Sequence, residues 1–192
     1  LARSLCLHGL IPADLLGLVP AGFQVPLGPR LACVVDGGGS WFNLLSSMFM
    51  HGDIMHIFGN MLFLWIFGDN IENRIGHIRY AVFYIICGLA AAAGQILMGP
   101  DSIIPMLGAS GAISGVMGGY VMLFPQRSVR AIIFHFATTV PAFVAIGIWI
   151  VYQLVLGYLT PSGGGGVAYA AHIGGFVAGV ALIRIFALGR SD

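Results

Sequence analysis

Long apolar stretches alternate with short polar breaks along most of the chain after residue 40. Five of these stretches are near or above the ~17–25 residues that a helix needs to cross the hydrocarbon core of a bilayer. The first is long enough that Trp41–Met50 is expected to lie along the membrane interface before the chain enters the bilayer around His51. The pattern predicts membrane-spanning helices over 42–67, 79–98, 108–124, 131–157 and 167–188.

Arginines are concentrated at one end of these predicted spans. Pairs of arginines join the first two spans and the third and fourth, and two more lie near the end of the last span and after it: Arg74, Arg79, Arg127, Arg130, Arg184 and Arg190. Because positive residues are enriched in cytoplasmic loops, this end is predicted to be cytoplasmic. Five spans with a cytoplasmic C-terminus then put the start of the chain outside.

Residues 1–40 do not continue the spanning pattern. They hold four prolines and the glycine-rich run Asp36-Gly37-Gly38-Gly39-Ser40, which favour a loop region with short helical pieces. The sequence thus predicts an extracytoplasmic loop region at 1–40 and a transmembrane domain at 41–190, in an all-α, polytopic helical bundle. The chain opens at Leu1 without methionine or a signal peptide pattern, so we expect it to be a fragment. Because five spans place Leu1 outside, we expect a further span before it, with a cytoplasmic N-terminus.

Composition supports a membrane protein and excludes several other classes. Hydrophobic residues make up 58% of the chain and charged residues 8%, against about 25% charged in a soluble domain. A net charge of +1 without a basic run gives no indication of a nucleic-acid partner. The three cysteines are an odd number without CxxC spacing, so neither a disulfide framework nor a zinc site is implied. A Cys6–Cys33 bridge stays open as an alternative.

The third predicted span is unusually short. Between Gly108 and Pro125 about 17 residues can be helical, which is about 25 Å of helix against a core near 30 Å. Irregular backbone within a bilayer is tolerated only where it is buried in protein or lines a wet cavity. The helix also carries small residues at helical spacing, which allow close approach of neighbouring helices: Gly108, Gly111, Gly115, Gly118 and Gly119. We therefore expect a central helix with Ser110 at its N-terminus, facing a recessed cavity.

Ser110 and His172 are the candidate catalytic pair. A serine hydroxyl is a weak nucleophile and needs a base within hydrogen-bond reach. His172 lies in an apolar run in which Ala171, Gly175 and Gly179 recur every four residues, so this helix can pack on the glycine face of the third span. That packing would bring the imidazole to the serine. No acidic residue lies inside a predicted span near either group, so a dyad is expected rather than a triad.

Donors for a developing oxyanion are also available. Ser110 stands at a helix N-terminus, where backbone N–H groups are free. His56 and Asn60 are four residues apart in the first span and share one helical face. His51 and His56 do not form an HExxH pattern and would lie about 140° apart on a helix. Neither a metal nor another cofactor is therefore expected.

Each of these features has a structural alternative. A GxSG tetrapeptide commonly reflects small-residue helix packing, and a single membrane histidine can serve packing or proton relay. His56 and Asn60 could form an interhelical hydrogen-bonding pair. The joint occurrence of all four residues at one expected membrane depth favours a hydrolytic site.

The segments around these residues resemble a known family. His51-Gly-Asp-Ile-Met-His56-Ile-Phe-Gly-Asn60, Gly108-Ala-Ser110-Gly111 and Ala171-His172-Ile-Gly174-Gly175-Phe-Val-Ala-Gly179, in this order, are similar to the rhomboid intramembrane serine proteases. The resemblance implies that Ser110 is the nucleophile and His172 the base, with His56, Asn60 and the Ser110 N–H lining an oxyanion hole. It also implies a supporting role for His51, Gly108, Gly111 and Gly175.

The same resemblance implies partners and a location. The family cleaves transmembrane segments of other membrane proteins, so transmembrane protein substrates and the lipid bilayer are the expected partners. We expect a multi-pass protein of the prokaryotic inner membrane, with its site opening to the extracytoplasmic side. A catalytically inactive rhomboid-like protein that binds membrane clients is the alternative, and a transporter is a third possibility.

Two features depart from the family pattern. The family core has six helices, and we expect the five predicted spans to correspond to the last five of them. Ser114, one turn after Ser110, stands where some members carry an aromatic residue that stacks on the base. We therefore expect the dyad to be held less firmly here.

Overall fold

The computed structural model describes residues 2–28, 31–35, 37–133, 136–160 and 167–189. Within these ranges, four helices are long and apolar enough to cross a membrane: Ile54–Ile75, His77–Met98, Ala142–Leu159 and Tyr169–Phe186. Ser110–Leu123 is a shorter apolar helix. The prediction of a mostly helical, multi-pass membrane protein is confirmed, and the short helix corresponds to the third predicted span, which the sequence indicated to be unusually short.

The N-terminal part of the chain precedes the bundle and consists of short elements. It comprises α1 (Ala2–His8), α2 (Pro12–Leu15), the strands β1 (Gln24–Gly28) and β2 (Leu31–Val34), α3 (Asn43–Ser46) and the 3₁₀ turn η1 (Ser47–Phe49). The two strands pair antiparallel, with Gln24 opposite Val34 and an irregularity between Pro26 and Gly28. Cys6 and Cys33 form a disulfide. The Cys6–Cys33 bridge that the sequence left open as an alternative is therefore present, and the third cysteine, Cys87, is unpaired and buried in the bundle.

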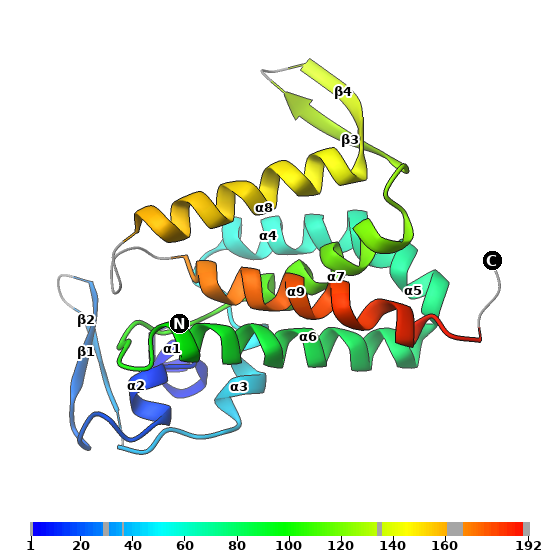
Figure 1. Cartoon of the computed structure of the whole chain (residues 1–192). Coiled ribbons are helices and arrows are strands. Elements are labelled where there is room, and N and C mark those ends of the chain that lie inside the picture. The colour runs from blue at the N-terminus through cyan, green and yellow to red at the C-terminus, as the bar shows by residue number, and fades with distance from the viewer. Residues whose placement is uncertain (1, 29–30, 36, 134–135, 161–166, 190–192) are drawn as a thin grey trace.

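The bundle itself contains the remaining elements. The first long helix runs through α4 (Ile54–Phe63), the π-helical segment η2 (Leu64–Gly68) and α5 (Asp69–Ile75). It is followed by α6 (His77–Met98), α7 (Ser110–Leu123), the hairpin β3 (Ser128–Ile133) and β4 (Phe136–Pro141), α8 (Ala142–Leu159) and α9 (Tyr169–Phe186). The N-terminal elements lie at one end of the bundle, while the α5–α6 junction and the last turns of α9 lie at the other (Figure 1).

Two predicted spans have the wrong bounds. The stretch 131–157 was expected to be one helix, but Ser128–Pro141 is a hairpin and α8 begins only at Ala142. The two strands are rich in β-branched residues, which favour strands, although their average hydropathy resembles that of a span. The stretch 42–67 also differs, because the helix begins at Ile54 and continues to Ile75. Its polar last turns lowered the hydropathy there without ending the helix.

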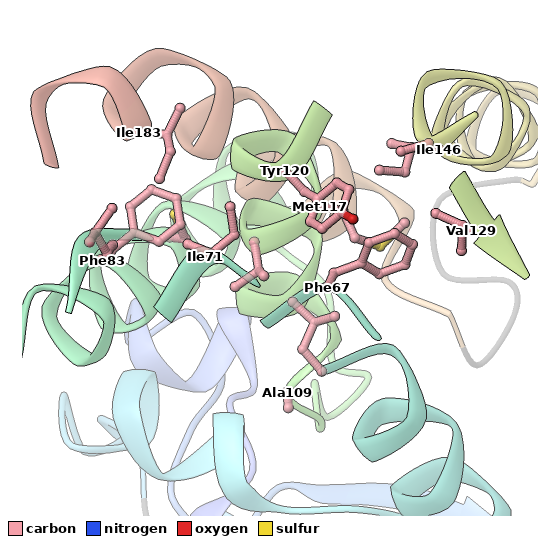
Figure 2. Packing of buried hydrophobic residues seen from close by; sticks show 14 residues of the cluster. Phe67, Ile71, Phe83, Ala109, Met117, Tyr120, Val129, Ile146 and Ile183 are labelled. Atoms are coloured by element: carbon pink, nitrogen blue, oxygen red, sulfur yellow. The ribbon is translucent and has the colours of Figure 1, made fainter. Parts of the chain in front are cut away.

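Helix α7 forms the centre of the bundle. Every residue from Gly111 to Tyr120 is buried, and its 14 residues span only about 21 Å. Core side chains converge on Met117 and Tyr120 from both sides, with Phe83 and Ile183 on one side and Phe67 and Ile146 on the other (Figure 2). The ring of Phe67 meets that of Tyr120 edge-on at 5.0 Å. A helix buried in this way is held by its neighbours along its length.

Backbone packs directly on backbone between α7 and α9. A Cβ added to Gly175 would collide with the carbonyl oxygen of Gly111, and one added to Gly179 would collide with that of Gly115. A Cβ on Gly118 would likewise collide with the carbonyl oxygen of Phe176. The predicted packing of the His172 helix on the glycine face of the third span is therefore present. It fixes how far apart the side chains of the two helices lie.

Candidate active site

Ser110 is the first residue of α7, and a turn at Gly108 immediately precedes the helix. Gly108 has φ +114°, a conformation that residues with a Cβ rarely adopt. Its N–H donates to the carbonyl oxygen of Ser47 at 2.9 Å, which anchors the turn to η1. The Ser110 side chain is half-buried. The fold thus presents the hydroxyl at an anchored turn on the central helix.

The imidazole of His172 lies against this hydroxyl. His172 Nε2 is 2.7 Å from Ser110 Oγ, and the histidine is buried, with 8% of its surface exposed. In the neutral ring one nitrogen carries a proton and the other accepts. If Ser110 donates to Nε2, the proton of the ring belongs on Nδ1.

Three further residues contact His172, and two of them, Gln153 and Trp149, were not predicted from the sequence to lie at the site. Gln153 Oε1 is 2.7 Å from His172 Nδ1. The ring of Trp149 lies 5.8 Å from the imidazole, tilted by 39°. Ser114 Oγ donates to the backbone oxygen of His172 at 2.5 Å. A polar amide within an apolar membrane helix could have flagged Gln153, since such groups are costly unless paired.

His56 and Asn60 approach the same turn from α4. A Cβ on Gly108 would lie 2.7 Å from His56 Nε2 and 3.5 Å from Asn60 Nδ2, so both nitrogens border the turn before Ser110. The Gly52 N–H points at His56 Nδ1 at 3.5 Å, which favours the tautomer with its proton on Nε2. Asp53 caps α4 by accepting from the His56 N–H at 2.8 Å.

Asn60 has an unused donor at this position. The residue is 7% exposed, and its Nδ2 has no hydrogen-bond partner within the described part of the chain. Buried amide groups are nearly always paired, so an orphan of this kind calls for a functional explanation. The donor is free to meet an oxygen that arrives beside Ser110.

His51 supports His56 rather than contacting the serine. The two imidazoles meet edge-on, with ring centres 5.0 Å apart. Burial and the neighbouring His56 lower the pKa of His51, and a hydrogen bond to the backbone of Phe49 partly offsets this. The ring is therefore neutral at pH 7.

A small cavity lies on the α6 side of Ser110. It has about 30 Å³ of free space, the volume of about one water molecule. Among the described residues, no group of three or more His, Cys, Asp and Glu side chains is placed to hold a metal ion. The residues around the cavity come from η1, α6, the loop before α7, α7 itself and α9, and include Ser47, Ala91, Met106, Gly108, Ser110 and Ala171.

Comparison with known proteins identifies the family. A family model described as the rhomboid domain matches residues 38–188. The chain belongs to the rhomboid family. Rhomboid relatives include RHOMBOID-like protein 4 of Arabidopsis thaliana, which is 32% identical over 88% of this chain and 39% of its own length. The mitochondrial Rhomboid protein 1 of Saccharomyces cerevisiae is 29% identical over 73% of the chain and 40% of its own length.

A bacterial rhomboid is also similar. The rhomboid protease GluP of Bacillus subtilis is 29% identical over 73% of this chain and 25% of its own length. The chain thus spans half or less of the length of these three relatives. Membership of the rhomboid family supports a multi-pass membrane protein. Because the relatives include plant and mitochondrial proteins as well as a bacterial one, the prokaryotic inner membrane expected from the sequence is not supported.

Proposed function

We propose that this rhomboid is an intramembrane serine endopeptidase that hydrolyses peptide bonds in or near transmembrane segments of other membrane proteins. The observation that carries the proposal is the 2.7 Å contact between Ser110 Oγ and His172 Nε2. Membership of the rhomboid family and the similarity to a named rhomboid protease support the same reaction class. Residues 41–190 would form the catalytic domain, with α7 as a short fifth span.

The first half of the reaction is acyl transfer to the serine. His172 Nε2 takes the proton from Ser110 Oγ as the oxygen attacks the carbonyl carbon of the scissile bond. The resulting oxyanion would accept from Asn60 Nδ2, from His56 Nε2 and from the Ser110 N–H. His172 then gives its proton to the leaving amine, the C–N bond breaks, and an acyl-enzyme ester forms.

The second half is hydrolysis of that ester. A water molecule gives a proton to His172 and attacks the ester carbonyl, and the second oxyanion meets the same donors. Collapse of this intermediate releases the new carboxyl end and returns the proton to Ser110. The cavity beside Ser110, with about 30 Å³ of space, has room for such a water.

The proposed orientation follows from the arginine-rich loops. With these loops cytoplasmic, the N-terminus of α7 and the site open toward the extracytoplasmic side. Substrates would be transmembrane proteins presented within the bilayer. Neither a cofactor nor a nucleic acid takes part in the proposed reaction.

Replacement of the nucleophile tests the proposal. Ser110→Ala should abolish both labelling by a fluorophosphonate serine probe in detergent and cleavage of a reporter transmembrane substrate in vesicles. Ser128→Ala, which changes an exposed serine of β3, should leave both unchanged. Ser110→Ala activity within tenfold of the parent would exclude Ser110 as nucleophile, because its loss removes the covalent route.

The parent protein decides between an enzyme and an inactive rhomboid. A well-folded parent that neither reacts with the probe nor cleaves any reporter, but still binds membrane proteins, would contradict the proposal. That outcome would favour the client-binding alternative.

A further inference from the structure

Gln153 is a polar exception in α8. The helix has 18 residues, and Gln153 lies in its second half among aliphatic and aromatic neighbours. The residue is buried, with 6% of its surface exposed. An amide that is buried in an apolar medium without a hydrogen-bond partner destabilises the fold. A buried glutamine at this position therefore needs a partner, and that partner is the Nδ1 atom of His172 at 2.7 Å.

The contact determines which nitrogen of His172 can act as a base. When Gln153 presents its carbonyl oxygen, Nδ1 must carry the proton, so the lone pair of Nε2 is free. That lone pair faces Ser110 Oγ, 2.7 Å away. The opposite tautomer would put a proton on Nε2 and would block proton removal from the serine. An acceptor at Nδ1 is thus a chemical requirement of the base, and Gln153 is the residue that meets it.

Trp149 adds a second contact from the same helix. It precedes Gln153 by four residues and so lies on the same face of α8. Its ring centre is 5.8 Å from that of His172. This aromatic surface restricts movement of the imidazole in addition to its contacts with Gln153 and Ser110. Helix α8 therefore contacts the imidazole both at Nδ1 and over its ring.

We propose that Gln153 is a positioning residue that fixes the tautomer and orientation of His172, with Trp149 limiting movement of the ring. This inference rests on the proposed function, in which His172 is the base. In a serine triad a carboxylate performs this orienting task; here a neutral amide performs it, which avoids an anion in the membrane interior. In this proposal the Ser110–His172 dyad has a neutral third partner, Gln153.

Gln153→Met tests the hydrogen bond, because methionine has a similar shape and cannot accept at Nδ1. We expect kcat for a reporter transmembrane substrate to fall about tenfold to hundredfold, a part of the 10²–10⁴ that general-base catalysis supplies. KM should stay within about threefold, because the proposal assigns Gln153 no contact with substrate. The rate of fluorophosphonate labelling should fall in the same ratio as kcat. Tyr152→Phe, at the exposed neighbouring position, should change none of these values.

Two more variants separate positioning from a structural role. Gln153→Glu keeps an oxygen acceptor whether or not it is ionised, so its kcat should recover to within about tenfold of the parent. In a His172→Ala background, Gln153→Met should cause no further loss of labelling, since a positioning residue acts only through the group it holds. Parental labelling by Gln153→Met would overturn the proposal, and so would a Gln153→Glu variant as impaired as Gln153→Met.

Labelling of the Ser110→Ala variant distinguishes a failure of the positioning role from a failure of the proposed function. If Ser110→Ala loses labelling while Gln153→Met reacts like the parent, only the positioning role fails. If Ser110→Ala retains labelling, the proposed function fails. Melting temperatures of all variants in the same detergent show whether Gln153→Met is folded. If it is not folded, the kcat of Gln153→Glu relative to the parent decides the positioning role of Gln153.

Discussion

Gly179 of α9 packs on the carbonyl group of Gly115 of α7 so closely that no side chain fits between them. The two helices carry the candidate base and the candidate nucleophile, respectively. Because both partners in this contact are backbone, neither can move aside as a flexible side chain would. The separation of the helices, and with it the distance from Ser110 to His172, depends on contacts of this kind.

Gly179→Ala should therefore destabilise the protein and reduce activity together. Overpacking a core typically costs about 1–3 kcal/mol, and the upper part of that range is expected because the collision is with backbone. Gly147→Ala is the matched control, since a Cβ at Gly147 in α8 would meet nothing within 4 Å. Thermal unfolding in detergent measures both variants. A Gly179→Ala protein as stable as Gly147→Ala would show that the helices can separate without loss.

Asn60→Ala should lower activity without lowering stability. Its Nδ2 has no partner in the described part of the chain, so truncation breaks no hydrogen bond of that nitrogen. Removal of one oxyanion donor typically costs about 10²–10³ in kcat. His56→Ala should also reduce kcat, but with some loss of stability, because its ring packs against His51.

The comparison for Asn60 is Asn73→Ala, at an exposed position on α5. This variant should retain the kcat of the parent. Turnover of the reporter substrate and melting temperature are measured for all three. If Asn60→Ala loses stability and activity in step, the residue holds the helices together and does not serve an oxyanion.

Acid should destabilise the protein partly through His51. Its pKa in the folded state lies below the ordinary 6.5, because burial and His56 disfavour the charged ring. The unfolded chain then binds more protons than the folded one just below pH 6.5, so stability falls as the pH falls through that range. His51→Gln removes this titration and should flatten the dependence of melting temperature on pH between about 7 and 5. His8→Gln, at an exposed position in α1, should leave the slope unchanged, and an equally steep slope in both variants would contradict the role of His51.

Hydropathy and small-residue spacing predicted much of the bundle. They indicated α6, α7 and α9 to within about three residues, and the glycine stripe correctly placed α9 on α7. The association of Ser110 with His172 followed from that packing alone. Glycine and alanine at helical spacing indicate close helix–helix contacts in a sequence, because larger residues would not fit between the helices.

Other parts of the structure could not be predicted in this way. The two strands before α8 have a mean hydropathy close to that of a span, and only their high content of β-branched residues distinguishes them. Gln153 is neutral and stands alone in α8, so nothing in the sequence connects it with His172 in another helix. The contact between the rings of Trp149 and His172 depends on the rotation of α8 about its axis. That rotation is decided by packing across the bundle, which no local pattern specifies.

The disulfide between Cys6 and Cys33 should stabilise the N-terminal part of the chain, which contacts the loop that leads to Ser110. The segment after α1 pairs with the loop before α7, since Met106 N–H donates to Leu10 O at 2.7 Å and Ala13 N–H donates to Ser102 O at 3.0 Å. The bridge joins cysteines 27 positions apart, and closing a loop of that size typically contributes about 2–4 kcal/mol.

A reductant such as dithiothreitol should therefore lower the melting temperature of the parent protein. The Cys6→Ser variant should melt at that lower temperature already and should not respond to the reductant. Its serine labelling should slow as well, because residues 10 to 13 would hold the loop leading to Gly108 less firmly. If reduction left both the melting temperature and the labelling rate of the parent unchanged, the N-terminal segment would be held by its backbone contacts alone, and the bridge would have no part in shaping the site.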